Sequence, residues 1–115
     1  MNGNEFTKTI PESLHLLVKL EDLTLSNNQF TGPIPESLGD LSNLHELNLD
    51  GNQLVGSVPT TLGQLEILGR LHLNGNSLEG QVPQEVCELR EGLLALLVTD
   101  CDSGEIGCDC CTKCH

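Results

Sequence analysis

The six cysteines of this chain are the residues best suited to covalent or metal chemistry. They are crowded toward the C-terminus, at Cys87, Cys101, Cys108, Cys110, Cys111 and Cys114. An even number of cysteines gathered in a short segment is typical of a disulfide framework formed in an oxidising compartment. The sequence does not choose among the many pairings that six cysteines allow.

Two other chemistries compete for the same thiols. The segment 111–115, with the sequence Cys-Thr-Lys-Cys-His, matches the spacing that attaches a c-type haem, but a haem needs a surrounding apolar pocket, and Met1 is the only methionine. Zinc binding is chemically allowed because thiolates and imidazole are preferred zinc ligands. The ligands would be Cys108, Cys110, Cys111, Cys114 and His115. Structural zinc sites usually join two separated ligand pairs, so we favour disulfides and expect no metal or cofactor.

Three polar residues, Ser26, Asp50 and His72, could form a hydrolytic site. A hydroxyl within reach of an imidazole is the minimum for an activated nucleophile. Nothing else in the sequence supports catalysis, because the open sheet predicted below offers no enclosed pocket and no evident oxyanion donors. We therefore expect a protein that is not an enzyme.

A fixed period of 24 residues positions these groups, as the spacing of Asn4, Asn28, Asn52 and Asn76 shows. In each copy, leucines alternate with polar residues, which is the pattern of a half-buried strand. The leucine pairs are Leu23 and Leu25, Leu47 and Leu49, and Leu71 and Leu73. Strands that recur after a full turn of chain must run parallel, so the period predicts a solenoid with one long sheet.

Other positions of the repeat have separate physical roles. An asparagine amide both donates and accepts, so a stack of asparagines can bond backbone groups of its own turn and of the neighbouring turn. Glycine before the second extended segment predicts an unusual backbone angle or a close approach, at Gly32, Gly56 and Gly80. Proline predicts the first position of a short helical turn, at Pro11, Pro35, Pro59 and Pro83. Gly39 and Gly63 predict the end of that turn.

The repeat resembles the plant-type leucine-rich repeats, whose frame LxxLxLxxNxLxGxIPxxLGxL is matched at residues 20–41, 44–65 and 68–89. The resemblance extends over residues 1–89. It implies a curved, right-handed solenoid with strands on the concave face, and with short helical turns and second extended segments outside. It also implies use as an extracellular ligand-binding ectodomain. The cysteine-rich tail is similar to the ending of secreted or membrane-anchored algal members.

We expect leucine-rich repeats over residues 1–89 and a last strand with a cysteine-rich cap over residues 90–115. After Leu89 the frame shifts by one residue, so that the strand positions are best filled by Leu93, Leu96, Val98 and Cys101, with Cys101 in place of asparagine. Leu94, Ala95 and Leu97 would then face outward, under a lid formed by residues 102–115. Cys87 takes the slot of Gly39 and Gly63, from which it can be tied to the tail.

The ends of the chain suggest a longer parent. Residues 2–4 align with residues 50–52, so the first copy lacks its strand and we expect further repeats and a signal peptide before Met1. The longest apolar run, residues 93–98, is too short to cross a bilayer, so we expect no membrane insertion by this segment. The net charge of −12 opposes contacts with phosphate, which argues against nucleic acid. We expect an extracellular or cell-surface location.

The exposed strand positions form the candidate ligand-binding face. The period arranges them in three columns: Asp22, Glu46 and Arg70; Thr24, Asn48 and His72; and Ser26, Asp50 and Asn74. This polar, mostly acidic surface suits a basic peptide, a protein or a hydroxyl-rich glycan. The chain has no Trp or Tyr, which are common anchors of tight interfaces, so we expect weak binding by this segment alone. A purely structural role, closing and spacing a longer receptor ectodomain, is the alternative.

Overall fold

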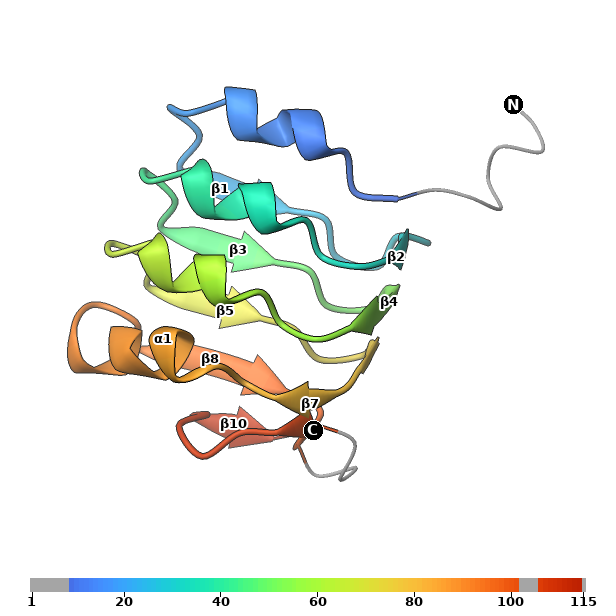
Figure 1. Ribbon diagram of the computed structural model, residues 1–115, viewed down its shortest axis with the longest axis vertical. Helices are drawn as coiled ribbons and strands as arrows, with labels where there is room; N and C mark the ends of the chain where they lie inside the picture. The colour runs from blue at the N-terminus through green and yellow to red at the C-terminus, as the bar shows by residue number, and fades with distance from the viewer. Residues whose placement is uncertain (1–8, 102–105, 115) are drawn as a thin grey trace.

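The computed structural model describes residues 9–101 and 106–114. Over these residues the chain winds into a right-handed solenoid, and each turn returns a strand and a helical turn to equivalent places (Figure 1). Asn4, expected in the asparagine stack, and His115, weighed as a zinc or haem ligand, lie outside the described residues.

One five-stranded parallel sheet runs the length of the solenoid on its concave face. Its strands, in spatial order, are β1 (Asp22–Thr24), β3 (Glu46–Asn48), β5 (Arg70–His72), β8 (Leu96–Thr99) and β10 (Lys113–Cys114). The second extended segments form β2 (Thr31–Gly32), β4 (Gln53–Gly56) and β6 (Ser77–Leu78), and β7 (Gly80–Gln81) pairs with β9 (Ile106–Gly107). The predicted parallel solenoid is confirmed.

Short helical turns stack in front of this sheet in Figure 1. They are η2 (Glu12–Leu16), η3 (Glu36–Asp40), η4 (Thr60–Gln64) and α1 (Gln84–Cys87), which is followed by η5 (Glu88–Glu91). Leucines from both layers fill the space between them. Leu47 and Leu71 of the strands and Leu38 and Leu62 of the helical turns have no exposed surface. Burial of one such side chain contributes roughly 1.5–3 kcal/mol.

The prolines and glycines have roles that differ in part from those predicted. Pro35 precedes η3 as its cap, with φ −64° and ψ 136°, instead of occupying its first position. Gly39 lies inside η3 and does not end it; the turn ends at Asp40, with Leu41 as its C-cap. Glycine is required there because helical turns stack closely: a Cβ on the equivalent Gly63 would lie 2.7 Å from the backbone oxygen of Glu85. Gly56 has φ +83°, as the predicted unusual backbone angle requires.

The predicted frame of the last strand is wrong by one residue. Leu97 pairs with Leu71 and is fully buried, and Leu94 is 1% exposed, whereas Leu93 is 61% exposed. Leu97 therefore lies two residues later than the 24-residue period requires, and the longer helical turn α1–η5 accommodates the extra length. In a run so rich in leucine, either frame supplies apolar residues, and only packing against the preceding turn selects one.

Asparagine amides link consecutive turns where the chain leaves each strand. Asn52 is 7% exposed. Its Nδ2 donates to the backbone oxygens of Leu49 and Asp50 in its own turn, and to that of Leu25 in the preceding turn. Its Oδ1 accepts hydrogen bonds from the backbone N–H groups of Asn28 and Phe30. One buried amide thus bonds backbone groups of two turns.

The stack continues through Asn76 and ends on a carboxylate. Asn76 donates to the backbone oxygens of Leu73 and Leu49, and its Oδ1 accepts from the N–H of Leu54. Its own backbone N–H donates to Asp100 Oδ2 at 3.0 Å. The assignment of Cys101 to this slot is wrong, because Asp100 supplies the acceptor and Cys101 forms a disulfide.

The C-terminal segment closes the solenoid by extending both of its sides. β9 adds to β7, and β10 adds to β8, where the N–H of Thr112 donates to the oxygen of Leu97. Arg90 also holds the segment, since its Nε donates to the backbone oxygen of Cys110 at 3.1 Å. This lid was predicted, although Leu94 and Leu97, which it was expected to cover, belong to the core instead.

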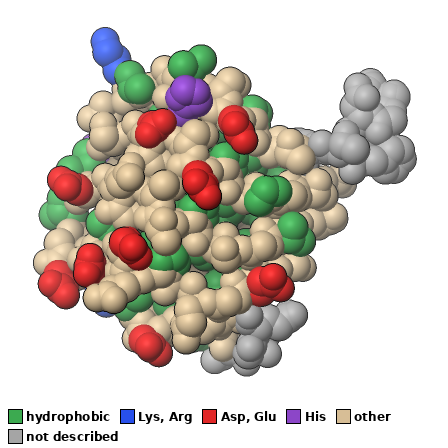
Figure 2. All heavy atoms as spheres, in the orientation of Figure 1, with side chains coloured by type: hydrophobic (Ala, Val, Ile, Leu, Met, Phe, Trp, Pro, Cys, Tyr) green, Lys and Arg blue, Asp and Glu red, His purple; other side chains and the backbone are tan. Residues whose placement is uncertain are grey.

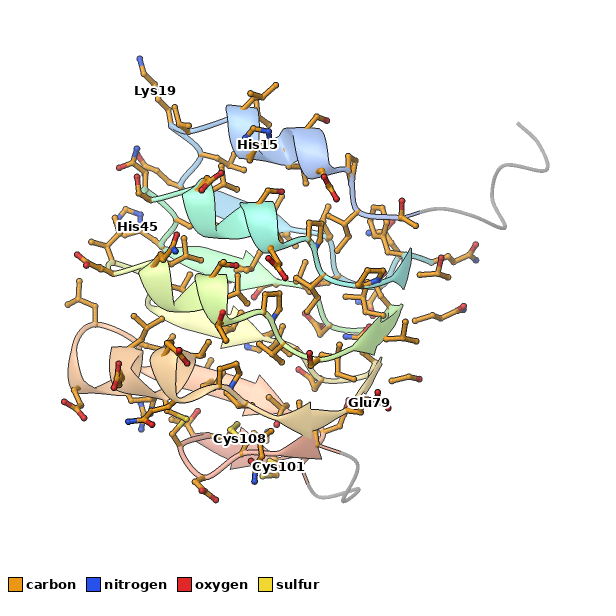
Figure 3. All side chains as sticks on the ribbon, viewed as in Figure 1. His15, Lys19, His45, Glu79, Cys101 and Cys108 are labelled. Atoms are coloured by element: carbon orange, nitrogen blue, oxygen red, sulfur yellow. A yellow bond between two sulfur atoms is a disulfide. The ribbon has the colours of Figure 1, made fainter. Side chains whose placement is uncertain are left out.

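Three disulfides staple this cap: Cys87–Cys110, Cys101–Cys114 and Cys108–Cys111. Figure 3 shows Cys101 and Cys108 at the β10 end of the molecule. The predicted link from Cys87 on the outer turn to the tail is confirmed. Because all six sulfurs are paired, none of them is a free thiol that could bind zinc or attach a haem in this structure.

We expect Asn52→Ala to destabilise the protein by about 1–3 kcal/mol, because buried backbone groups lose their partners. Asn48→Ala is the matched control, since Asn48 lies on the half-exposed side of β3, where water can replace the amide. Urea unfolding of both variants measures the difference. Equal loss of stability in the two would contradict the division between buried stack and surface.

Loss of the Cys87–Cys110 bond should cost more than loss of Cys108–Cys111, because their sequence separations are 23 and 3 residues. The chain-entropy relation gives about 3 kcal/mol for the longer loop and about 2 kcal/mol for the shorter one. Paired Cys→Ser variants, made by a secretory route and checked by non-reducing peptide mapping, test this order. The reverse order, or unfolding of the parent protein by EDTA alone, would count against the assignment.

Candidate functional site

The three predicted columns of polar residues are aligned on the concave face. Asp22, Glu46 and Arg70 are paired in register across β1, β3 and β5. Thr24, Asn48 and His72 form the second column in the same way. The third column, which follows the strands, contains a direct contact: the Ser26 hydroxyl donates to Asp50 Oδ1 at 2.7 Å. Parallel pairing puts the members of a column on one side of the sheet, about 4.8 Å apart.

Asn48 is the centre of a hydrogen-bond network on this face. Its Nδ2 donates to Glu46 Oε2 at 2.7 Å and to Thr24 Oγ1 at 3.4 Å. Its Oδ1 is the partner of His72 Nδ1. Because the Asn48 oxygen can only accept, His72 carries its proton on Nδ1. Within the described residues, His72 Nε2 has no hydrogen-bond partner.

The geometry does not assemble the hydrolytic site considered from the sequence. The Ser26 hydroxyl donates to Asp50, and His72 is bonded to Asn48, so the imidazole does not accept the serine proton. A nucleophile and its base must be within hydrogen-bond reach of each other. The three residues share a face but serve separate hydrogen bonds, which fits a surface that binds and does not catalyse.

Arg70 is an exposed cation on an otherwise acidic surface. It lies beside Glu46 in register, but the Glu46 carboxylate accepts a hydrogen bond from Asn48. Within the described residues, the Arg70 side chain makes no hydrogen bond or ion pair. Its guanidinium, with five donors, is therefore available to a carboxylate or another acceptor brought by a partner.

The columns continue into the cap, which the sequence analysis did not predict. Leu96 follows Arg70, and Val98 follows His72, so β8 adds an apolar step to the face. Lys113 of β10 pairs with Val98 and extends the second column with an exposed cation. The tail departs from the 24-residue period, so the spacing of the sequence does not align Lys113 with His72. The position of Lys113 on this face could therefore not be predicted.

The third column includes an unsatisfied polar atom. Asn74 Oδ1 is buried and has no hydrogen-bond partner within the described residues. Its backbone oxygen, by contrast, accepts from the N–H groups of Gly51 and from the side chain of Asn76. Asn74 therefore belongs to the solenoid framework as much as to the surface.

The opposite face has a different character. Figure 2 shows acidic side chains scattered over the helical turns, separated by other residues.

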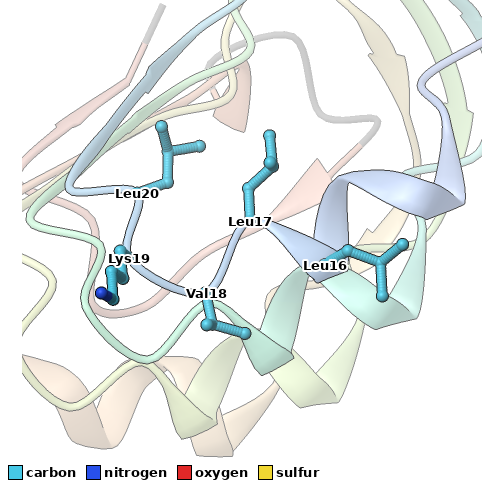
Figure 4. Close-up of a pocket in the computed structure, with 5 residues that line it drawn as sticks. All are labelled: Leu16, Leu17, Val18, Lys19 and Leu20. Atoms are coloured by element: carbon cyan, nitrogen blue, oxygen red, sulfur yellow. The ribbon is translucent and has the colours of Figure 1, made fainter.

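At the N-terminal end, an apolar depression of about 540 Å³ is lined by residues 16–20 (Figure 4). Leu17 is 51% exposed there, whereas the equivalent Leu41 and Leu65 of later turns are fully buried. The first described helical turn thus lacks a layer that covers the later ones.

Across 9–101 and 106–114, no group of three or more His, Cys, Asp or Glu side chains is arranged to hold a metal ion. In the same ranges, no helix has the length and apolar character needed to cross a membrane.

Comparison with known proteins gives matches to family models and to solved structures. Two models, each described as leucine rich repeat, match residues 1–54 and 68–89, which is more than half of the chain. No curated protein sequence matches the chain.

Plant receptor ectodomains are among the similar solved structures. One is that of the Arabidopsis thaliana receptor kinase GASSHO1/SCHENGEN3 in complex with CASPARIAN STRIP INTEGRITY FACTOR 2, with TM-score 0.75 and 37% identity over 82% of this chain and 11% of that chain. A chain of the Arabidopsis thaliana BIR3–SERK2 complex has TM-score 0.73 and 37% identity over 80% of this chain and 49% of its own.

A third structure is the ectodomain of the Arabidopsis receptor kinase HAESA with an N-terminally extended IDA peptide hormone. It has TM-score 0.72 and 30% identity over 82% of this chain and 19% of that chain. This chain therefore spans less than half the length of each of these three relatives. From its repeats, its parallel sheet and these matches, the chain belongs to the leucine-rich-repeat family, in its plant-type form.

Proposed function

We propose that this chain is a non-catalytic recognition module that binds a peptide or protein on its concave face. The proposed contact residues are the three columns: Asp22, Glu46 and Arg70; Thr24, Asn48 and His72; and Ser26, Asp50 and Asn74. The observation that carries the proposal is the exposed, unpartnered Arg70 set among fixed polar groups. Preorganised donors and acceptors lose little conformational entropy on binding, which favours recognition.

The relatives support this class of function. The GASSHO1/SCHENGEN3 ectodomain was solved with CASPARIAN STRIP INTEGRITY FACTOR 2, and the HAESA ectodomain with an IDA peptide hormone. The third structure is a complex of BIR3 with SERK2. The three disulfides fit an oxidising compartment, so we place the protein outside the cell or at its surface, as the C-terminal part of a larger ectodomain. A glycan remains the alternative ligand for so polar a face.

The apolar N-terminal end suggests an additional, structural role. We propose that Leu17 packs against another leucine-rich repeat, because repeats bury their leucines only against neighbouring repeats. The same segment would then close a longer solenoid through its cap. Both roles are compatible, since the concave columns and the apolar end lie on different surfaces.

We expect Arg70→Glu to weaken binding of peptides selected from a displayed random library by about tenfold at low salt, with a smaller effect at high salt. Stability should be unchanged, because Arg70 has no partner to lose. Lys19→Glu is the control: it makes the same change in charge at an exposed lysine outside the concave sheet (Figure 3). Equal effects of the two changes would contradict the proposed site. Selection of glycans instead of peptides from parallel arrays would favour the alternative ligand.

We expect Leu17→Ala to cost far less stability than Leu41→Ala in the chain as it stands. Truncation of a buried leucine costs about 2–5 kcal/mol, whereas Leu17 is already half exposed. When a copy of residues 25–48 is joined ahead of Met1, so that Met1 takes the slot of Leu49, the cost of Leu17→Ala should rise toward that of Leu41→Ala. No rise in a folded fusion would contradict the packing role.

A further inference from the structure

The concave face carries its charges in a spatial order. Its acidic end comprises Asp22 on β1, Glu46 on β3 and Asp50 just beyond β3. Arg70 follows on β5, and Lys113 lies at the far edge on β10. The sheet order β1-β3-β5-β8-β10 therefore runs from anionic to cationic side chains.

An apolar step separates the two cations. Leu96 pairs with Arg70 and is partly exposed, and Val98 pairs with both His72 and Lys113. Val98 is only 3% exposed, so a ligand that crosses the strands meets acidic groups, a guanidinium, the Leu96 side chain and an ammonium in turn. This order comes from the pairing of the strands and is independent of side-chain rotamers.

The charges on the two sides are available to a ligand. The side chains of Arg70 and Lys113 have no hydrogen bond or ion pair within the described residues, and both residues are exposed. Asp22 is exposed as well, and Glu46 uses one carboxylate oxygen for Asn48, which leaves its other oxygen open. The opposite charges of Glu46 and Arg70 do not cancel through a direct ion pair, so each can face a separate group of a partner.

The spacing matches an extended peptide. From β3 to β10 there are three strand intervals, or roughly 14 Å at about 4.8 Å each. An extended peptide rises about 3.4 Å per residue, so it covers this distance in about four residues.

We propose that the concave face is a bipolar site for an extended peptide whose charges are segregated. A basic side chain of the peptide lies over Asp22 and Glu46, and an acidic side chain lies about four residues away between Arg70 and Lys113. The aliphatic stem of that acidic side chain contacts Leu96, which lies on β8 between the two cations. This inference rests on the proposed function and specifies its ligand class.

Four blocked synthetic peptides test the charge order, each acetylated and amidated so that its ends carry no charge. The first has two lysines, two leucines and two glutamates in that order, and the second has the same residues with the charges alternating. The third replaces the glutamates with lysines, and the fourth replaces the lysines with glutamates. Composition and net charge are therefore identical in the first pair.

We expect the segregated peptide to bind at least about tenfold more tightly than its alternating isomer, measured by calorimetry at low salt. We also expect it to bind more tightly than the all-basic or the all-acidic peptide. Lys113→Glu should remove most of the preference, whereas Lys19→Glu should leave it unchanged. Oxidised protein with all three disulfides is used throughout, and circular dichroism checks that each variant is folded.

The outcomes separate this inference from the proposed function. If library-selected peptides bind the concave face but segregated and alternating isomers bind equally, the bipolar site is wrong and peptide recognition stands. Tightest binding by the all-basic peptide would also overturn the inference, since the acidic end alone would then account for affinity. If no peptide from the library binds, the proposed function itself fails.

Discussion

The fold depends on hydrogen bonds between consecutive turns at the point where the chain leaves each strand. There the backbone has lost its sheet partners but stays buried, and an unsatisfied buried group costs about 1–3 kcal/mol. Asn52 resolves this by donating to its own turn and to the preceding one while accepting from two N–H groups. Asp100 replaces the amide at the last turn, where acceptance alone is needed. The leucine core can stack regularly only because these polar groups are bonded.

Because the leucines and asparagines stabilise the interior, the solvent-facing side of the strands is available for the proposed recognition. Leucines and asparagines hold the interior, so the alternate strand positions bear no structural demand and carry Glu46, Arg70 and His72 in register. Parallel pairing fixes the distances between them, and the bonds around Asn48 fix their orientation. The result is an open, rigid, polar surface. Such a surface offers many contacts to an extended ligand but encloses no reacting group.

The two ends of the solenoid differ in how their apolar core is covered. At the C-terminal end, β9 and β10 continue the sheets, Arg90 holds the tail, and Cys87 stands where earlier turns have glycine. Glycine is unnecessary at that slot because no further helical turn packs on it. At the N-terminal end, the apolar surface around Leu17 is uncovered by the described residues. The cap also contributes Lys113 to the concave face, so the segment that closes the solenoid also supplies a side chain to the proposed binding surface.

The sequence by itself determined the solenoid, the parallel sheet and the three columns, because a 24-residue period and a two-residue alternation admit one arrangement. It also identified Asn52 as a residue that bonds two consecutive turns, and Cys87 as a residue tied to the tail. It did not determine the frame of the last strand, since Leu93 and Leu94 are chemically equivalent and only packing puts Leu94 inside. The disulfide pairing, the role of Asp100 and the position of Lys113 were likewise decided by tertiary structure. Each depends on how an aperiodic tail folds back on the last turn. The spacing of residues along the sequence does not predict which residues that folding brings into contact.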